Sequence, residues 1–320
     1  MKKTLAILCA LCMIFALGAA TAFADDSYTV GICQLVQHPA LDAATQGFID
    51  ALNEALGEGN VTFYNQNASG DSANCSIICN QFVTDDVDLI MANATPALLA
   101  AQAATNKIPI LGTSVTDYAS ALDIPEDEWT GATGTNISGA SDGVPAEGYA
   151  VLLNELFPEA KNVGILYCSG EPNSKFQADQ IRPILEEMGY SVKDFTFADS
   201  NDVAAVTNNA CDDCDVLYIP TDNTAASNAE LINSVVLDKK VPVVAGEENI
   251  CLGCGCVTLS ISYYDLGVVT GQMAAKVLTG EAEVGEMEIE YAPFEKKYNE
   301  TNCEILGIEV PEDFIVIEAE

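Results

Sequence analysis

Two runs of alternating strand and helix patterns constrain the fold of this chain more than any other feature. In each run, short segments rich in Val, Ile and aromatic residues alternate with longer stretches of helical periodicity. Strands that follow one another in this way need crossover connections, which predicts parallel sheets covered on both faces by helices. The first run predicts strands at Tyr28–Cys33, Val61–Tyr64, Asp88–Met91 and Ile108–Leu111, and helices at Leu41–Leu56, Ser72–Val83 and Pro96–Thr105.

The second run has the same rhythm, and the two together predict an α/β protein with two doubly wound, Rossmann-like lobes. Its strands are expected at Val163–Cys168, Val192–Phe197, Val216–Ile219 and Val241–Ala245, with helices at Ala146–Leu156, Lys175–Met188, Val203–Ala210 and Ala225–Leu237. The Gly- and Ser-rich stretch Gly131–Gly143 and the segment Thr258–Ser262 are the expected crossings. We therefore assign 25–140 plus 259–286 to the first lobe and 141–258 plus 287–320 to the second, with a ligand cleft between them.

The charge balance excludes several classes of partner and chemistry. With 12 Lys+Arg against 48 Asp+Glu the formal net charge is −36, so nucleic acid and anionic membranes are not expected partners. The single histidine, His38, excludes zinc sites that need two or three imidazoles. No resident cofactor or metal is expected.

The first 24 residues have the pattern of a secretory signal peptide. Lys2 and Lys3 precede an apolar run from Leu5 to Leu17, and Ala22-Phe23-Ala24 provides the small-residue cleavage pattern before Asp25. We expect cleavage near Ala24 and an extracytoplasmic product, with a lipid anchor at Cys9 or Cys12 as a weaker alternative because leucine precedes both.

Ten cysteines follow the predicted cleavage site, and their spacing leaves their role open. Cys211 and Cys214 form one CxxC pair, and Cys251, Cys254 and Cys256 form a second cluster. Disulfides or structural thiols, a structural metal site and a redox role are all compatible with this spacing, in that order of preference. Cys75 and Cys79 would share one helix face, while Cys33 and Cys168 fall inside apolar strands.

Polar residues follow most of the predicted strands, at the edge where open parallel sheets bind ligands. Thr95-Pro96 reads as the start of a helix, whose N–H groups could hold a carboxylate. Asp117, Asp222 and Glu248 are candidates to hold an ammonium group. Ordinary capping or turn formation is the alternative for each residue alone. The candidate binding residues are Gln37, His38, Asn93, Thr95, Thr113, Thr116, Asp117, Tyr118, Glu171, Asn173, Ser174, Asp222, Asn223 and Glu248.

Catalysis is not expected, because no catalytic motif accompanies these residues. Neither a Gly-x-Gly-x-x-Gly nor a phosphate-binding Gly-x-x-x-x-Gly-Lys loop occurs. His38 reads as a hydrogen-bonding side chain at the cleft or as a packed one. Trp129, the only tryptophan, lies in an acidic loop, where a surface or hinge-covering role is expected.

Several of these segments together resemble the substrate-binding proteins of ABC transporters, in the branch associated with tryptophan and tyrosine uptake. The resemblance runs from about Tyr28 to Gly280 and rests on Val36-Gln37-His38-Pro39-Ala40-Leu41-Asp42, Ala94-Thr95-Pro96-Ala97, Thr135-Asn136-Ile137-Ser138-Gly139, Glu171-Pro172-Asn173-Ser174 and Ile219-Pro220-Thr221-Asp222-Asn223-Thr224. It implies a type I periplasmic-binding-protein fold with three connecting segments.

The resemblance also implies a function: capture of a small solute by cleft closure, then docking of a monomeric receptor on an ABC permease. An aromatic amino acid is the expected ligand, with its zwitterionic part between Thr95 in one lobe and Asn173, Ser174 and Asp222 in the other. Tyr118 stands where related chains often have proline, and we expect it to stack on the ligand. A ligand sensor coupled to a signalling partner is the main alternative, and an enzyme on this fold is a weaker one.

Overall fold

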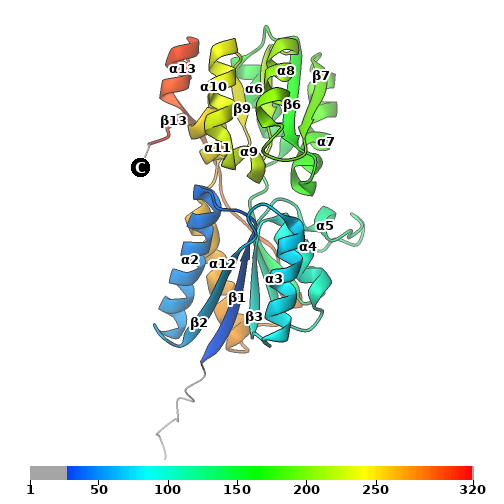
Figure 1. The fold of residues 1–320 in the computed structure, drawn as a ribbon, viewed down its shortest axis with the longest axis vertical. Coiled ribbons are helices and arrows are strands. Elements are labelled where there is room, and N and C mark those ends of the chain that lie inside the picture. Colours follow the sequence, from blue (N-terminus) through cyan, green and yellow to red (C-terminus); the bar gives the residue numbers. More distant parts are fainter. Residues whose placement is uncertain (1–26, 319–320) are drawn as a thin grey trace, which may run out of the picture.

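The computed structural model describes residues 27–318, which form two α/β lobes one above the other (Figure 1). The predicted signal peptide, with Cys9 and Cys12, lies outside the described residues. None of the helices between residues 27 and 318 is both long and apolar enough to cross a membrane.

The first lobe contains a six-stranded parallel sheet in the order β11-β5-β4-β3-β1-β2. Its central strands are buried along their whole length, which explains their continuous apolar sequence. The elements of this lobe are β1 (Tyr28–Gln34), α2 (Pro39–Leu56), β2 (Val61–Asn67), α3 (Ser72–Thr84), β3 (Leu89–Asn93), α4 (Thr95–Ala104), β4 (Ile110–Val115), α5 (Tyr118–Ala121), β5 (Ile137–Ser141), α12 (Tyr263–Leu278), η1 (Val284–Glu286) and β11 (Glu290–Tyr291).

The second lobe contains a seven-stranded sheet in the order β13-β12-β10-β9-β8-β6-β7. All pairs are parallel except β10 with β12. Its elements are α6 (Ala146–Leu156), β6 (Asn162–Cys168), α7 (Pro172–Glu187), β7 (Ser191–Phe197), α8 (Val203–Asp213), β8 (Val216–Ile219), α9 (Asn223–Ser227), α10 (Ala229–Lys239), β9 (Val243–Ala245), α11 (Glu248–Cys254), β10 (Val257–Ser260), β12 (Glu295–Tyr298), α13 (Glu300–Leu306) and β13 (Ile315–Val316).

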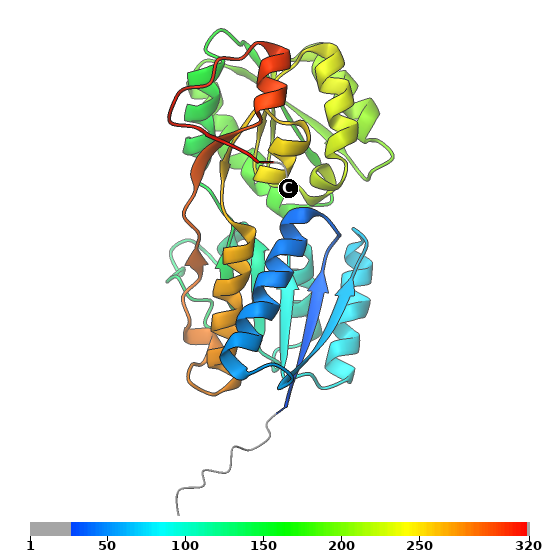
Figure 2. The same cartoon turned by 90° about the vertical axis from the view of Figure 1, so that its left-hand side faces the viewer.

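The two-lobed α/β architecture predicted from the sequence is confirmed, and the chain crosses between the lobes three times. The crossings follow β5, β10 and β11, and they run side by side along one edge of the molecule (Figure 2). Strand β10 pairs within the second sheet up to Ser260, and β11 pairs with β5 in the first sheet. The sequence-based division into 25–140 plus 259–286 and 141–258 plus 287–320 stays a prediction, and the sheets favour later second and third crossings.

Glycines let helices α2 and α12 of the first lobe pack with their backbones in close approach. A Cβ atom at Gly267 would lie 2.0 Å from the carbonyl oxygen of Ala44, and one at Gly47 would lie 2.1 Å from that of Tyr264. No side-chain rotation can relieve a clash with backbone. The α12 helix, which leads out of the second crossing, is thereby fixed to the first lobe.

We expect Gly267→Ala to lower the free energy of unfolding by about 1–3 kcal/mol, the usual cost of overpacking. Gly148→Ala in α6 is the matched control, because the added methyl group would meet only the flexible end of Leu259. Urea denaturation measures both variants. Equal stability of the two variants would contradict the close-packed helix pair.

The ten cysteines of the described residues are all buried free thiols in this structure. Cys75 and Cys79 share one face of α3, as predicted, and both contact Cys33 of β1. No group of three or more His, Cys, Asp or Glu side chains among residues 27–318 is arranged to hold a metal ion. All ten cysteines pack in the hydrophobic core clusters of the structure.

Candidate functional site

A small enclosed cavity lies between the lobes, at the ends of strands from both sheets. We call it the cleft cavity; it encloses about 10 Å³, so the lobes are closed against each other. The first lobe and the crossings contribute residues at the ends of β1, β4, β5 and β10, and the second lobe contributes residues that follow β6, β8 and β9. The cavity is lined by His38, Leu41, Ser114, Thr116, Asp142, Asn173, Thr221, Asp222, Asn223, Ala226, Glu247 and Tyr263.

Buried polar atoms without a hydrogen-bond partner concentrate around this cavity. Four of its lining residues each have one: His38 Nδ1, Ser114 Oγ, Asp142 Oδ1 and Asn173 Oδ1. Such atoms cost about 1–3 kcal/mol each when they are left unpaired, so native proteins keep them mainly where a ligand or water completes the bonding. Their convergence from both lobes marks a binding site for a polar group.

Three buried carboxyl groups face the same cavity, and burial raises the pKa of each of them. The pKa of Asp142 is raised to about 6, that of Glu247 to about 7 and that of Asp222 to about 8. Glu171 adds to the shift at Asp222 by charge repulsion. His38 is the only basic side chain of the lining, and burial lowers its pKa. The cavity is therefore suited to a cation and not to an anion.

Asp142 has the carboxyl group whose hydrogen bonding is least complete. Its Oδ2 accepts a hydrogen bond of 2.9 Å from the hydroxyl of Tyr263, whereas Oδ1 is buried without a partner. Asp222 is better satisfied, since it accepts hydrogen bonds of 2.7 Å from the N–H groups of Cys168 and Ala225. An ammonium group entering the cavity would thus find its best acceptor at Asp142.

Glu171 organises the second lobe's side of the cavity without lining it. Its carboxylate accepts bonds from the N–H groups of Asn223 and Thr224, at 2.9 and 2.8 Å, and from both of their side chains. This fixes Asn223, whose Oδ1 lies 3.1 Å from His38 Nε2 across the cleft. The His38–Asn223 contact joins the two lobes directly.

A second cavity of about 260 Å³ opens at the entrance of the cleft and shares Asn173 with the cleft cavity. We call it the mouth cavity. Thr95, Leu99 and Asp117 of the first lobe line it, and Phe176 of the second lobe faces them. Thr95 Oγ1 is buried without a partner, at the start of α4. The mouth cavity thus combines a polar end with an aromatic wall.

The structure places half of the fourteen sequence-predicted residues in the lining of the two cavities. His38, Thr116, Asn173, Asp222 and Asn223 line the cleft cavity, and Thr95, Asp117 and Asn173 line the mouth cavity. Four others, Asn93, Thr113, Glu171 and Ser174, are buried behind these residues and line neither cavity.

Three predicted residues lie elsewhere. Gln37 is exposed. Tyr118 is buried in the core of the first lobe, where its hydroxyl donates to the carbonyl of Ala140 at 3.3 Å, so the expected stacking contact has no place in this structure. Glu248 accepts hydrogen bonds from Lys297 Nζ, at 2.8 Å, and from the hydroxyl of Ser260, and it lines neither cavity.

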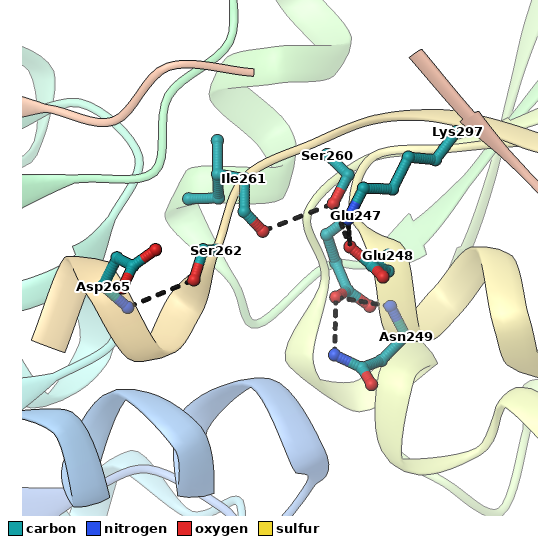
Figure 3. Close-up of polar contacts among 8 residues, drawn as sticks. All are labelled: Glu247, Glu248, Asn249, Ser260, Ile261, Ser262, Asp265 and Lys297. Carbon is teal, nitrogen blue, oxygen red and sulfur yellow. Dashed lines mark hydrogen bonds and ion pairs between the residues drawn. The ribbon is translucent and has the colours of Figure 1, made fainter. Parts of the chain in front are cut away.

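Glu247, the neighbour of Glu248, lines the cleft cavity instead, and Figure 3 shows its carboxylate beside Asn249 at the start of α11. Its carboxylate caps α11 by accepting hydrogen bonds from the N–H groups of Asn249 and Ile250. Asp142, Ser114 and Tyr263 also line the cavity without having been predicted. Asp142 directly follows strand β5, and that position is the signal that could have identified it. The Gly- and Ser-rich sequence of β5 instead predicts a crossing between the lobes.

The raised pKa values predict that the ligand-free protein loses stability as pH rises from 5 to 8. The unfolded chain has ordinary carboxyl pKa values near 4, so between these limits the folded state binds more protons, and deprotonation favours unfolding. Thermal melts of wild type and Asp142→Asn test the origin of this effect. The overall negative charge of the chain acts on both proteins. A steeper loss of stability with pH in wild type than in Asp142→Asn therefore reports the titration of Asp142, and parallel losses would contradict its raised pKa.

Comparison with known proteins gives a consistent family. Residues 29–320 match the family model described as ABC transporter substrate binding protein. Over 262 residues the chain is 36% identical to a "Tyrosine-binding protein" of Clostridioides difficile (strain R20291), which covers 81% of this chain and 75% of the relative. These matches concern solute-binding proteins and support the receptor interpretation over the sensor and enzyme alternatives.

Two solved structures also indicate the arrangement of the lobes. A Streptococcus pneumonia protein in complex with L-Trp is 29% identical, with a TM-score of 0.85 over 91% of this chain and 100% of that one. The ligand-free, open structure of a substrate binding protein with adhesive properties from Clostridium difficile is 35% identical, but its TM-score is 0.67 over 92% and 100%. The lobes of the present chain are therefore arranged more like those of the L-Trp complex, despite the lower sequence identity.

Proposed function

The chain belongs to the ABC transporter substrate binding proteins, and from that premise we propose that it captures a free aromatic amino acid between its lobes. The observation that carries the proposal is the cleft cavity, with three buried carboxyl groups and no lysine or arginine among its lining residues. An ammonium group satisfies such a site, and it provides the hydrogen-bond donors that Asp142 Oδ1 and Asn173 Oδ1 lack.

The rest of the ligand fits the mouth cavity. An aromatic ring would lie against Phe176 and Leu99 in this cavity of about 260 Å³. The ligand carboxylate would accept a hydrogen bond from the hydroxyl of Thr95, which is buried without a partner, near the N-terminus of the ten-residue helix α4. The relatives that bind L-Trp and tyrosine support an aromatic ligand.

Cleft closure is the working motion of this proposal. The cleft cavity of about 10 Å³ is too small for an amino acid to enter, so the lobes must separate before binding and close afterwards. His38 and Asn223 meet only when the lobes close. The closed receptor, a monomer exported by the signal peptide that ends near Ala24, would then dock on an ABC permease.

A thermal-shift and calorimetry series with the chain from Asp25 tests this function. Refolded protein is titrated with tyrosine, tryptophan and phenylalanine, with leucine as the aliphatic control and N-acetyltyrosine as the control without an ammonium group. Ligand at about 100 times its Kd should add about 2.7 kcal/mol of stability. Stabilisation by the aromatic amino acids alone is expected. An equal response to N-acetyltyrosine would overturn the role of the carboxyl groups, and an equal response to leucine would overturn the aromatic specificity.

A further inference from the structure

A larger cavity, of about 750 Å³, lies against two of the three crossings and adjoins the mouth cavity, with which it shares Asp117, Ser120 and Phe176. We call it the hinge cavity. One wall is the loop after α5, including Trp129, and another is α7 of the second lobe, including Phe176. The crossings contribute the stretch from Gly143 to Glu147 and the residues Tyr291, Ala292 and Phe294. Its volume is in the range of small-molecule sites.

The lining of the hinge cavity is aromatic and acidic. Trp129, Phe176, Tyr218, Tyr291 and Phe294 contribute rings from both lobes and from the third crossing. Tyr291 and Phe294 are 60% and 46% exposed, although both are large hydrophobic side chains. Unfilled aromatic surface of this kind, gathered on one concavity, is typical of a binding site.

Charge restricts what this cavity can take. Asp117, Glu126 and Glu147 are its charged residues, and no lysine, arginine or histidine is among the described residues that line it. Partial burial and the Asp117 carboxylate raise the pKa of Tyr291, so the negative charge of Asp117 acts at this ring. Anions are therefore excluded, and a cation gains both from the carboxylates and from the ring faces.

We propose that the hinge cavity is a second small-molecule site, which takes a monocationic aromatic amine. The ring of the amine packs among Trp129, Tyr291 and Phe294, and its ammonium group lies toward Glu126 and Glu147. Because both lobes form the walls, the complete cavity exists only in the closed arrangement, and an occupant favours closure.

A direct hydrogen-bonded link couples this site to the cleft. Gln177 lines the hinge cavity, and its Oε1 accepts a hydrogen bond of 2.7 Å from the N–H of Thr221, while its Nε2 donates to Thr221 Oγ1 at 3.2 Å. Thr221 lines the cleft cavity. Occupancy of the hinge cavity is therefore expected to raise affinity at the cleft, and the effect must be reciprocal.

Calorimetry with phenethylamine tests the proposal, and fluorescence of Trp129, the only tryptophan, reports the site directly. We expect one phenethylamine to bind to Asp142→Asn, in which the cleft is disabled, and to change the Trp129 emission. The double variant Tyr291→Ala/Phe294→Ala should weaken phenethylamine binding at least tenfold, whereas Tyr64→Ala, at an exposed tyrosine elsewhere on the first lobe, should not. Neutral 2-phenylethanol should bind at least tenfold more weakly.

The results separate this site from the cleft. Saturating tyrosine should leave phenethylamine binding intact and tighten it. Displacement of phenethylamine by tyrosine, its loss in Asp142→Asn, or insensitivity to Tyr291→Ala/Phe294→Ala would overturn the second site and leave the proposed amino-acid function standing. If tyrosine fails to bind while phenethylamine binds Asp142→Asn and responds to Tyr291→Ala/Phe294→Ala, the hinge site stands and the proposed function falls.

Discussion

Replacing Asp142 with asparagine is expected to raise the Kd for the aromatic amino acid by about 100-fold or more. The change keeps the size of the side chain and an acceptor for the Tyr263 hydroxyl, but it removes the charge at Oδ1, the buried oxygen without a partner. Removing one member of a buried, hydrogen-bonded charge pair costs about 2–5 kcal/mol. Calorimetry at pH 8, where the carboxyl group of wild type is ionised, measures the loss.

The same variant should gain stability when no ligand is present. The hydrogen bond from Tyr263 offsets only part of the cost of burying ionised Asp142, so Asp142→Asn is expected to melt above wild type at pH 8. Asp265→Asn is the matched control, because this residue is exposed at the start of α12 and lies outside both cavities. A variant that binds tyrosine like wild type would remove Asp142 from the site, and a less stable one would indicate a structural role.

The ends of the strands could be located from the sequence, because the apolar pattern of a buried strand stops where the strand stops. Buried parallel strands are short apolar runs, and their carboxyl ends lie at one edge of each sheet, which is why His38, Asn173 and Asp222 meet although they are far apart in the chain. The cleft was therefore predictable as a place, together with several of its residues.

The direction of individual side chains was less predictable. Tyr118 begins a single helical turn that directs its ring into the core beside Gly112 and Gly139, and no local pattern distinguishes that from a ring in the cleft. Strand β5 contains Ser and Gly because it packs closely against β4, where the Tyr118 ring takes up the space, so its sequence resembles a loop. Asp142 was missed for that reason. The glutamates after β9 were located, but the cap geometry decides which one turns inward.

Glu247→Gln and Glu248→Gln should differ strongly although the residues are adjacent. Glu247 faces the cleft cavity with a carboxyl group whose pKa is raised to about 7, and its oxygens both accept backbone N–H groups of α11. We expect Glu247→Gln to raise the Kd for tyrosine by about 10- to 100-fold at pH 8, because the amide removes the charge and places an N–H donor against a helix N-terminus.

Glu248→Gln should change the Kd by less than about threefold. Its ion pair with Lys297, drawn in Figure 3, is partly exposed, so its loss costs at most about 1 kcal/mol of stability. Calorimetry of both variants at pH 8 and pH 6 completes the comparison. Wild-type affinity should fall toward pH 6, since Glu247 and Asp222 then take up protons, and Glu247→Gln should show the smaller fall. A larger loss of affinity in Glu248→Gln than in Glu247→Gln would overturn this assignment. It would place the ammonium site at Glu248, away from Asp142.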